Sequence, residues 1–262
     1  MIVLDNATLL DTLVAFMLVS ARISAMLLAA PLFSASSVSI PIRIITALTI
    51  AVMLLQAVPT PKVDIISPEG ALALAGEVIL GAAIGFLFQL GFAAVQLAGE
   101  QIAASTGLGF AAMVDPQTGT QSPVINQFLS IMMLLSFLTL EGHHLLLKLL
   151  AASYQVLPIG AAFLNANILI GIAKAGALIF SAGMLACLPI IVALFLVTLV
   201  IGILTRVAPQ MNLFSVGFAI SILAGLTLLL VALPSLTASM AGILDETANR
   251  ARALILNTDG GA

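Results

Sequence analysis

Long apolar stretches separated by isolated charges run through this sequence. No charged residue lies between Glu77 and Glu100, and the chain is again uncharged from residue 175 to 205. Six apolar segments stand out: 12–32, 42–58, 71–98, 124–140, 168–204 and 211–234. A helix crosses a bilayer with about 20 mostly apolar residues, because each adds ~1.5 Å to a span of ~30 Å. The segments lack the alternation of barrel strands, so the pattern predicts membrane helices.

Two of these segments do not fit a simple span. Segment 168–204 is too long for one perpendicular crossing, and Pro189 in its middle could kink it. The alternative is a helix or bent hairpin that projects beyond the bilayer or packs inside an assembly. Segment 124–140 is short and runs directly into Glu141. After the last segment, residues 241–256 place their apolar side chains on one helical face, which predicts a continuation of that helix or, alternatively, a helix that docks a partner.

Composition supports a membrane class. Of 262 residues, 62% are hydrophobic and 7% are charged, and the mean hydropathy is +1.27. Soluble domains are nearer to half apolar and a quarter charged. With eight scattered basic residues and a net charge of −3, the chain also lacks the clustered cations that bind a phosphate backbone, so no nucleic-acid partner is expected.

Residues 99–123 differ from the segments around them. They contain four glycines and two prolines, yet their middle is apolar. Irregular backbone at membrane depth is tolerated only inside protein or beside a water-filled cavity. The pattern predicts a re-entrant or lumen-facing loop that acts as a flexible constriction; the alternative is a connector that dips into the interface. The candidate constriction consists of Gly107, Leu108, Gly109, Phe110, Ala111, Ala112, Met113, Val114, Asp115 and Pro116.

Several ionisable residues lie within or beside apolar segments, where an unpaired charge is costly. The favoured interpretation is polar contacts between subunits, with Glu100 at the base of the loop as the best candidate. The alternative is a proton relay through Glu77, Glu100, His143 and His144. The candidates for contacts between subunits are Arg22, Glu77, Glu100, His143, Lys174 and Arg206.

Glycines repeat along segment 71–98, and Gly81 and Gly85 form a G-x-x-x-G frame. Small residues in this frame allow two helix backbones to approach closely. Glu77 and Gln89 lie on the same segment. The segment is therefore expected to face protein rather than lipid.

No catalytic motif is present in the sequence. It has no phosphate-binding P-loop and no nucleophile elbow, and its single cysteine and two histidines make no ligand set for a metal. We therefore expect no enzyme activity, no metal and no cofactor.

Ordered motifs along the chain resemble the FliR family of flagellar type III export proteins, and the resemblance covers essentially the whole chain. Glu141 and the doubled histidine depart from the family's pattern. The matching motifs are Gly99-Glu100, Gly107-Leu108, Phe110-Ala111, Val114-Asp115-Pro116, Pro123-Val124, Gly142-His143, Ser153-Tyr154, Pro158-Ile159-Gly160, Arg206, Pro209-Gln210, Asn212-Leu213-Phe214 and Gly217-Phe218.

The resemblance implies an all-α membrane protein of about six long apolar helices, arranged as helical hairpins within a helical hetero-oligomer. Residues 1–165 would form a part similar to FliP that contains the loop 99–123. Residues 166–262 would form a hairpin similar to FliQ with an amphipathic C-terminal helix. In such a protein, the loop 107–124 would plug the closed channel.

The implied function is that of a subunit of the flagellar export gate, which passes unfolded secreted proteins. Implied partners are FliP-like, FliQ-like, FlhB-like and FlhA-like proteins in the bacterial inner membrane, at the flagellar basal body, with the assembly projecting to the periplasmic side. Two alternatives are a self-sufficient proton-coupled secondary transporter and an injectisome homologue of the gate.

Overall fold

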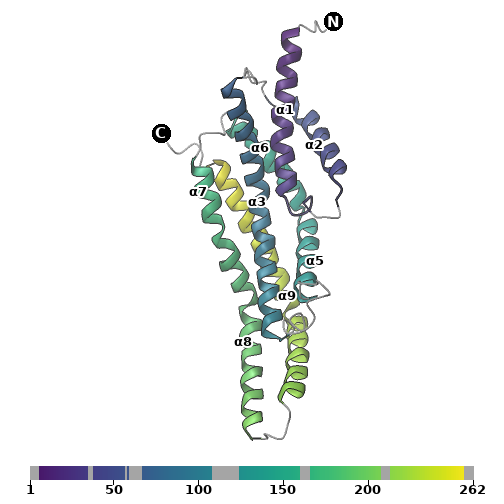
Figure 1. Cartoon of the computed structure of the whole chain (residues 1–262), viewed down its shortest axis with the longest axis vertical. Helices are drawn as coiled ribbons and strands as arrows, with labels where there is room; N and C mark the ends of the chain where they lie inside the picture. The colour runs from purple at the N-terminus through teal and green to yellow at the C-terminus, as the bar shows by residue number, and fades with distance from the viewer. Residues whose placement is uncertain are drawn as a thin grey trace. The chain divides into compact units, whose positions relative to one another are not determined.

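The computed structural model describes residues 6–34, 38–56, 58, 67–107, 124–159, 166–207 and 213–256. Throughout these ranges the regular secondary structure is helical, so the expected all-α class is confirmed (Figure 1). The helices are α1 (Asn6–Ala29), α2 (Ile40–Leu55), α3 (Pro68–Ser105), α5 (Val124–Thr139), α6 (Gly142–Val156), α7 (Ala166–Ala175), α8 (Ala177–Val207) and α9 (Leu213–Leu256).

The start of α3 follows from its local sequence. Pro68 occupies the first helical position, where its missing N–H is not needed. The Ser67 hydroxyl accepts a hydrogen bond from the backbone N–H of Gly70 at 3.1 Å, which caps the first turn. Glu69 adds a negative charge at the positive end of the helix. A capped start and a long apolar run together give the longest helix of the N-terminal half.

The expected number of about six long apolar helices is not confirmed by the residues that the structure describes. Four helical stretches are long and apolar enough to cross a membrane: Leu10–Ala29, Pro68–Ser105, Ile170–Leu204 and Ala219–Ile255. The pair α5 and α6 qualifies only as one bent span, with an angle of 61°. Glu141 lies at this bend with a φ of 54°, a left-handed conformation that interrupts the helix. Helix α2 has only 16 residues and is too short.

The long segment 168–204 is interrupted at Gly176, and the expected kink at Pro189 stays a prediction. Helix α7 ends at Ala175, α8 begins at Ala177, and Pro189 lies inside α8. In contrast, α9 runs without interruption to Leu256. The expected continuation of the last apolar segment through residues 241–256 is therefore confirmed.

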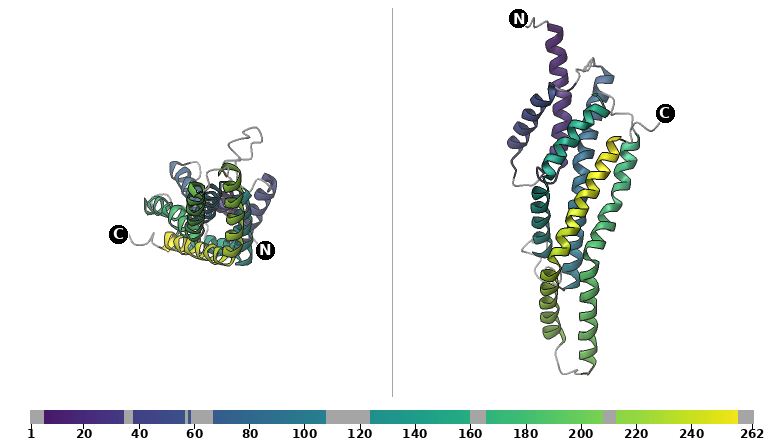
Figure 2. Two further views of the ribbon diagram at one scale, coloured as in Figure 1. Left: turned by 90° about the horizontal axis from the view of Figure 1, so that it is seen from below. Right: turned by 180° about the vertical axis from the view of Figure 1, so that it is seen from behind.

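The chain divides into two compact units. Unit 1 consists of residues 1–90, 141–176 and 245–262, and unit 2 of residues 91–140 and 177–244. In unit 1, α2 lies beside α1, and the last turns of α9 run beside α7 (Figures 1 and 2). In unit 2, the rings of Phe92 and Phe137 meet edge to face at 5.8 Å and join α3 to α5. These units group residues that pack together, whereas the expected FliP-like and FliQ-like parts, 1–165 and 166–262, are based on resemblance to other proteins. The expected parts therefore stay a prediction.

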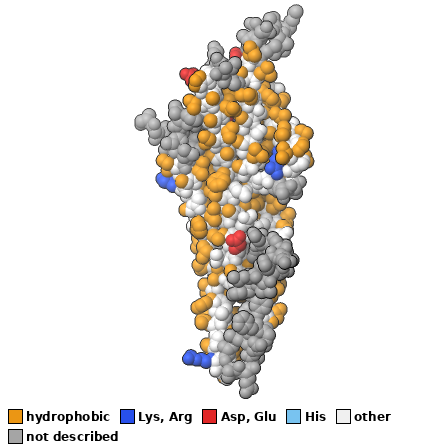
Figure 3. Space-filling model, viewed as in Figure 1, with side chains coloured by type: hydrophobic (Ala, Val, Ile, Leu, Met, Phe, Trp, Pro, Cys, Tyr) orange, Lys and Arg blue, Asp and Glu red, His pale blue; other side chains and the backbone are white. Residues whose placement is uncertain are grey.

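Much of the described surface is apolar, with few charges on the face that Figure 3 shows. The helices differ in this respect: 67% of the most apolar window of Pro68–Ser105 is buried, against 17% for Ile170–Leu204 and for Ala219–Ile255. Exposed side chains along α8 include Phe180, Leu185, Phe195 and Val200. Such a surface requires lipid or other protein chains around it.

Candidate functional site

Arg22 of α1 is fully buried in unit 1, and its guanidinium is bonded on three sides. Its Nε donates to Glu77 Oε2 at 2.6 Å, Nη1 to Ser153 Oγ at 3.0 Å and Nη2 to the carbonyl of Leu157 at 3.1 Å. The centre of the Tyr154 ring lies 4.1 Å from the guanidinium carbon of Arg22. The side chains of Arg22 and Glu77 are both 0% exposed. This Arg22 cluster joins α1, α3 and the C-terminal end of α6.

The hydrogen bonds of the Arg22 cluster hold three helices together. A planar guanidinium with five donors suits several acceptors at once, which an ammonium would satisfy less well. Removing one partner of a buried ion pair typically costs about 3–5 kcal/mol, because the other charge is left uncompensated. Tyr154 also donates its hydroxyl to the carbonyl of Val19 at 3.2 Å, a second link between α6 and α1.

Close approach of α1 and α3 depends on glycine. A Cβ atom at Gly81 would collide with the carbonyl oxygen of Arg22, and one at Gly85 with the carbonyl oxygen of Met26. At Gly85 it would also lie 2.9 Å from the Cβ of Ala29. The G-x-x-x-G frame therefore packs α3 against α1, as the sequence indicated. The same contact brings Glu77, one turn before Gly81, within reach of Arg22.

In unit 2, a polar contact joins the two ends of the loop that the sequence singled out. Asn126 in the first turn of α5 donates from Nδ2 to Glu100 Oε1 at 3.3 Å. Asn126 is 7% exposed, and its Oδ1 has no hydrogen-bond partner in the described part of the chain. Gly99 makes room for this contact, since a Cβ there would lie 2.8 Å from the Cα of Asn126. We call Gly99, Glu100 and Asn126 the loop clasp.

Gly107, the first residue of the candidate constriction, lies two positions after the end of α3 and adopts a left-handed conformation. Its φ is 82°, and its N–H donates to the carbonyl of Ala104 at 3.2 Å. A glycine adopts this φ without steric cost, whereas a side chain there is strained. Residues 108–116, the rest of the candidate constriction, lie outside the described residues.

The remaining candidates have separate surroundings. His144 Nδ1 lies 3.5 Å from Glu141 Oε2. The ring centres of His143 and His144 are 4.2 Å apart. Lys174 and Arg206 are exposed. Among the residues described, no group of three or more His, Cys, Asp or Glu side chains could hold a metal ion.

The charged residues that the sequence singled out thus belong to several different contacts in the structure. Arg22 and Glu77, expected to contact other subunits, pair with each other in the interior of unit 1. Glu77 and Glu100, expected in one alternative to share a proton relay, belong to the two separate clusters described above. For Glu100, His143, Lys174 and Arg206, contacts between subunits stay a prediction.

Sequence reasoning missed the partners of these charges. Ser153 and Tyr154 stand out in the sequence only as a motif of the resemblance, and the carbonyl of Leu157 carries no sequence signal at all. The signal that could have found Asn126 is its amide in the first turn of an apolar helix, which favours a buried polar contact.

Comparison with known proteins extends over most of the chain. The model of the family described as "Bacterial export proteins, family 1" matches residues 13–247. The flagellar biosynthetic protein FliR of Escherichia coli strain K12 is 35% identical over 213 residues, which are 81% of this chain and 82% of that protein. FliR of Pectobacterium carotovorum is 37% identical over 213 residues, with the same coverage. FliR of Bacillus subtilis strain 168 is 35% identical over 227 residues, 86% of this chain and 88% of that protein.

Proposed function

Because this chain belongs to the family of bacterial export proteins, family 1, we propose that it acts as a subunit of the flagellar type III protein export gate. The observation that carries the proposal is the match to several flagellar FliR proteins over about four fifths or more of both chains. Its apolar helices and its family membership support a location in the bacterial inner membrane. In this proposal the chain helps to form the channel through which unfolded flagellar proteins pass, and it catalyses no reaction.

We propose further that the loop 107–124 closes the channel of this gate. The described residues at both ends of the loop support this role. Gly107 turns the chain out of α3 with a φ of 82°, and the loop clasp ties the end of α3 to the start of α5. A loop whose ends are held together can move as one piece without displacing the helices. Its apolar residues, among them Phe110 and Met113, would then seal an aqueous passage and repack when it opens.

The proposed partners are FliP-like and FliQ-like chains, with FlhB-like and FlhA-like components of the same apparatus, and unfolded flagellar proteins are the substrates. Sparse burial along Ile170–Leu204 and Ala219–Ile255 supports an assembly, because these helices leave most of their apolar side chains uncovered. Projection of the assembly to the periplasmic side belongs to the same proposal.

Purification in a mild detergent, followed by mass spectrometry of the bound chains, tests the proposal. A gate subunit is expected to copurify with FliP-like and FliQ-like chains, with a fixed number of copies of each chain per complex. A protein that is stable alone or as a homo-oligomer, and that transports a solute in that form, would instead be the self-sufficient transporter.

A further inference from the structure

In unit 2, three neighbouring helices hold the C-terminal end of α3, and each contact depends on a glycine. The loop clasp supplies the contact with α5, at Gly99. On α8, a Cβ at Gly183 would lie 2.6 Å from the carbonyl oxygen of Ala94. On α9, a Cβ at Gly225 would collide with the Cγ2 methyl group of Thr106, the residue directly after α3. The contact with α9 is therefore the one nearest to the loop.

Thr106 is fixed in the position in which it meets α9. Its side chain is 1% exposed, and its Oγ1 donates to the carbonyl of Ala103 at 2.8 Å. Its backbone N–H donates to the carbonyl of Ile102 at 3.0 Å. A β-branched side chain is stiff at χ1, so turning the methyl group away from Gly225 would also break a buried hydrogen bond. Since Gly107 follows directly, this contact sets where the chain leaves α3 for the loop.

Around Gly225, α9 has a buried face and an exposed face. Gly225 and Leu229 are buried. Leu223 and Leu230 point away from them and are 66% and 67% exposed. Exposed apolar side chains of this size offer a surface on which a neighbouring chain of the proposed assembly can press. A force on this exposed face reaches the end of α3 through Gly225.

From these contacts we propose that Gly225 is a positioning residue for the loop, and that α9 regulates the closed state of the channel through Thr106. The inference rests on the proposed role of the loop as a plug, and it names the helix that regulates this plug. While the channel is closed, Thr106 packs on Gly225 and holds the first residue of the loop. A displacement of α9 moves Thr106, and the loop then leaves the passage.

Substitution of Gly225 in the purified gate complex tests the inference, with the single-channel conductance to small ions as the measurement. In Gly225→Ala, the added Cβ displaces Thr106, and the mean conductance is expected to rise about tenfold above that of the wild type. Thr106→Ser removes the methyl group and keeps the hydroxyl. In the double variant Gly225→Ala/Thr106→Ser, the conductance should fall back most of the way, because only the Thr106 Cβ contact at 3.1 Å remains.

A second variant keeps the inference testable if Gly225→Ala does not assemble. Thr106→Ala removes the side-chain methyl group that packs on Gly225 and adds no bulk. The loss of this contact is expected to raise the mean conductance about fourfold. An assembled Thr106→Ala complex with the conductance of the wild type would overturn the inference.

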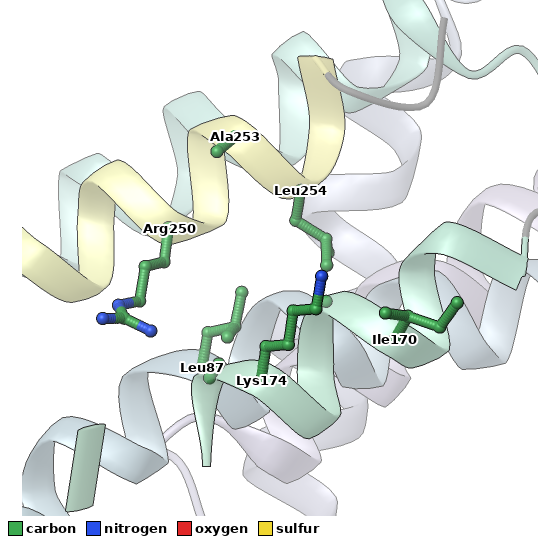
Figure 4. A pocket seen from close by; sticks show the side chains of 8 residues that line it. Leu87, Ile170, Lys174, Arg250, Ala253 and Leu254 are labelled. Carbon is green, nitrogen blue, oxygen red and sulfur yellow. The ribbon is translucent and has the colours of Figure 1, made fainter. Parts of the chain in front are cut away.

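Gly171→Ala, on α7 in unit 1, is the matched control. A Cβ there would lie 2.7 Å from Leu254 Cδ1, so this glycine is also in close contact. Figure 4 shows Leu254 reaching from α9 toward α7, at the border of a cavity of about 420 Å³. The flexible end of this leucine therefore has room to turn aside, whereas Thr106 does not. The control is expected to keep the conductance of the wild type, and a rise equal to that of Gly225→Ala would overturn the inference.

Deletion of residues 107–114, measured in parallel, separates this inference from the proposed plug. If the deletion opens the channel but Gly225→Ala does not, α9 does not hold the loop, and only the inference is overturned. If the deletion does not open the channel, the proposed plug is wrong and the inference is overturned with it. If Thr106→Ser does not reduce the rise caused by Gly225→Ala, the effect does not pass through Thr106, which also overturns the inference.

Discussion

The Nε atom of Arg22 lies 2.6 Å from Glu77 Oε2, and neither side chain has any exposed surface. The two residues are 55 positions apart in the sequence, on α1 and α3, so their contact fixes how these helices pack. With Ser153 and the carbonyl of Leu157 on its other nitrogens, the guanidinium also holds the end of α6. The interior of unit 1 is therefore held together by one charge and its acceptors as well as by apolar packing.

Loss of either partner should destabilise unit 1 strongly. Glu77→Ala is expected to lower the free energy of unfolding by about 3–5 kcal/mol, because Arg22 would remain buried without its counter-charge. Thermal unfolding followed by circular dichroism in detergent measures the change. Glu69→Gln, an exposed acid in the first turn of the same helix, is the control and should cost at most about 1 kcal/mol. Equal effects of the two substitutions would contradict the assigned role of the pair.

Gly81→Ala should disrupt the contact between α1 and α3. The added Cβ would collide with the carbonyl oxygen of Arg22, and overpacking of this kind costs about 1–3 kcal/mol. Gly242→Ala is the matched control, since nothing lies within 4 Å of a Cβ there, and it should be neutral or stabilise by up to ~1 kcal/mol. The same melting experiment separates the two. A neutral Gly81→Ala would show that the helices do not approach each other this closely.

Asn126→Ala should release the loop clasp while leaving the helices folded. The expected loss of stability is only about 0.5–1.5 kcal/mol, the net value of one hydrogen bond. Ion leakage through the purified gate in a planar bilayer should nevertheless rise, because the ends of the proposed plug are no longer tied. Gln96→Ala, an exposed amide on α3, is expected to leave conductance at the wild-type level. An equal rise in ion leakage in both variants would mean that the loop clasp does not help to keep the channel closed.

Substitutions at Gly107 should depend on backbone preference rather than on size. At a φ of 82°, Gly107→Val is strained, whereas asparagine tolerates left-handed conformations more readily. Swimming motility of a strain that carries only the variant should fall with valine and be retained largely with asparagine. Were both variants equally motile, the exit of the chain from α3 would not require this conformation.

The apolar runs predicted the helices well, because about 20 mostly apolar residues are enough for a membrane helix even when a paired charge lies among them. They did not predict where long runs break. Pro189 sits within α8, since a proline is tolerated in membrane helices whose neighbours or side chains satisfy the freed carbonyl. Gly176 and Glu141 mark the breaks instead, and the left-handed φ of Glu141 is not a preference that its residue type signals.

Buried charges were recognised from sequence, but their partners were not. An arginine within an apolar segment must be paired, yet any of several acids could serve, and only the approach of α3 to α1 at Gly81 selects Glu77. The carbonyl of Leu157 illustrates the general limit: a backbone acceptor is present at every position, and the fold alone decides which one a guanidinium meets.

Deletion of residues 107–114 tests most directly whether this chain closes an export channel. In the purified gate complex, the single-channel conductance to small ions should rise from near zero to a steady open level, while the subunit composition stays unchanged. Conductance that remains at the wild-type level in an intact complex would mean that this loop does not occupy the passage.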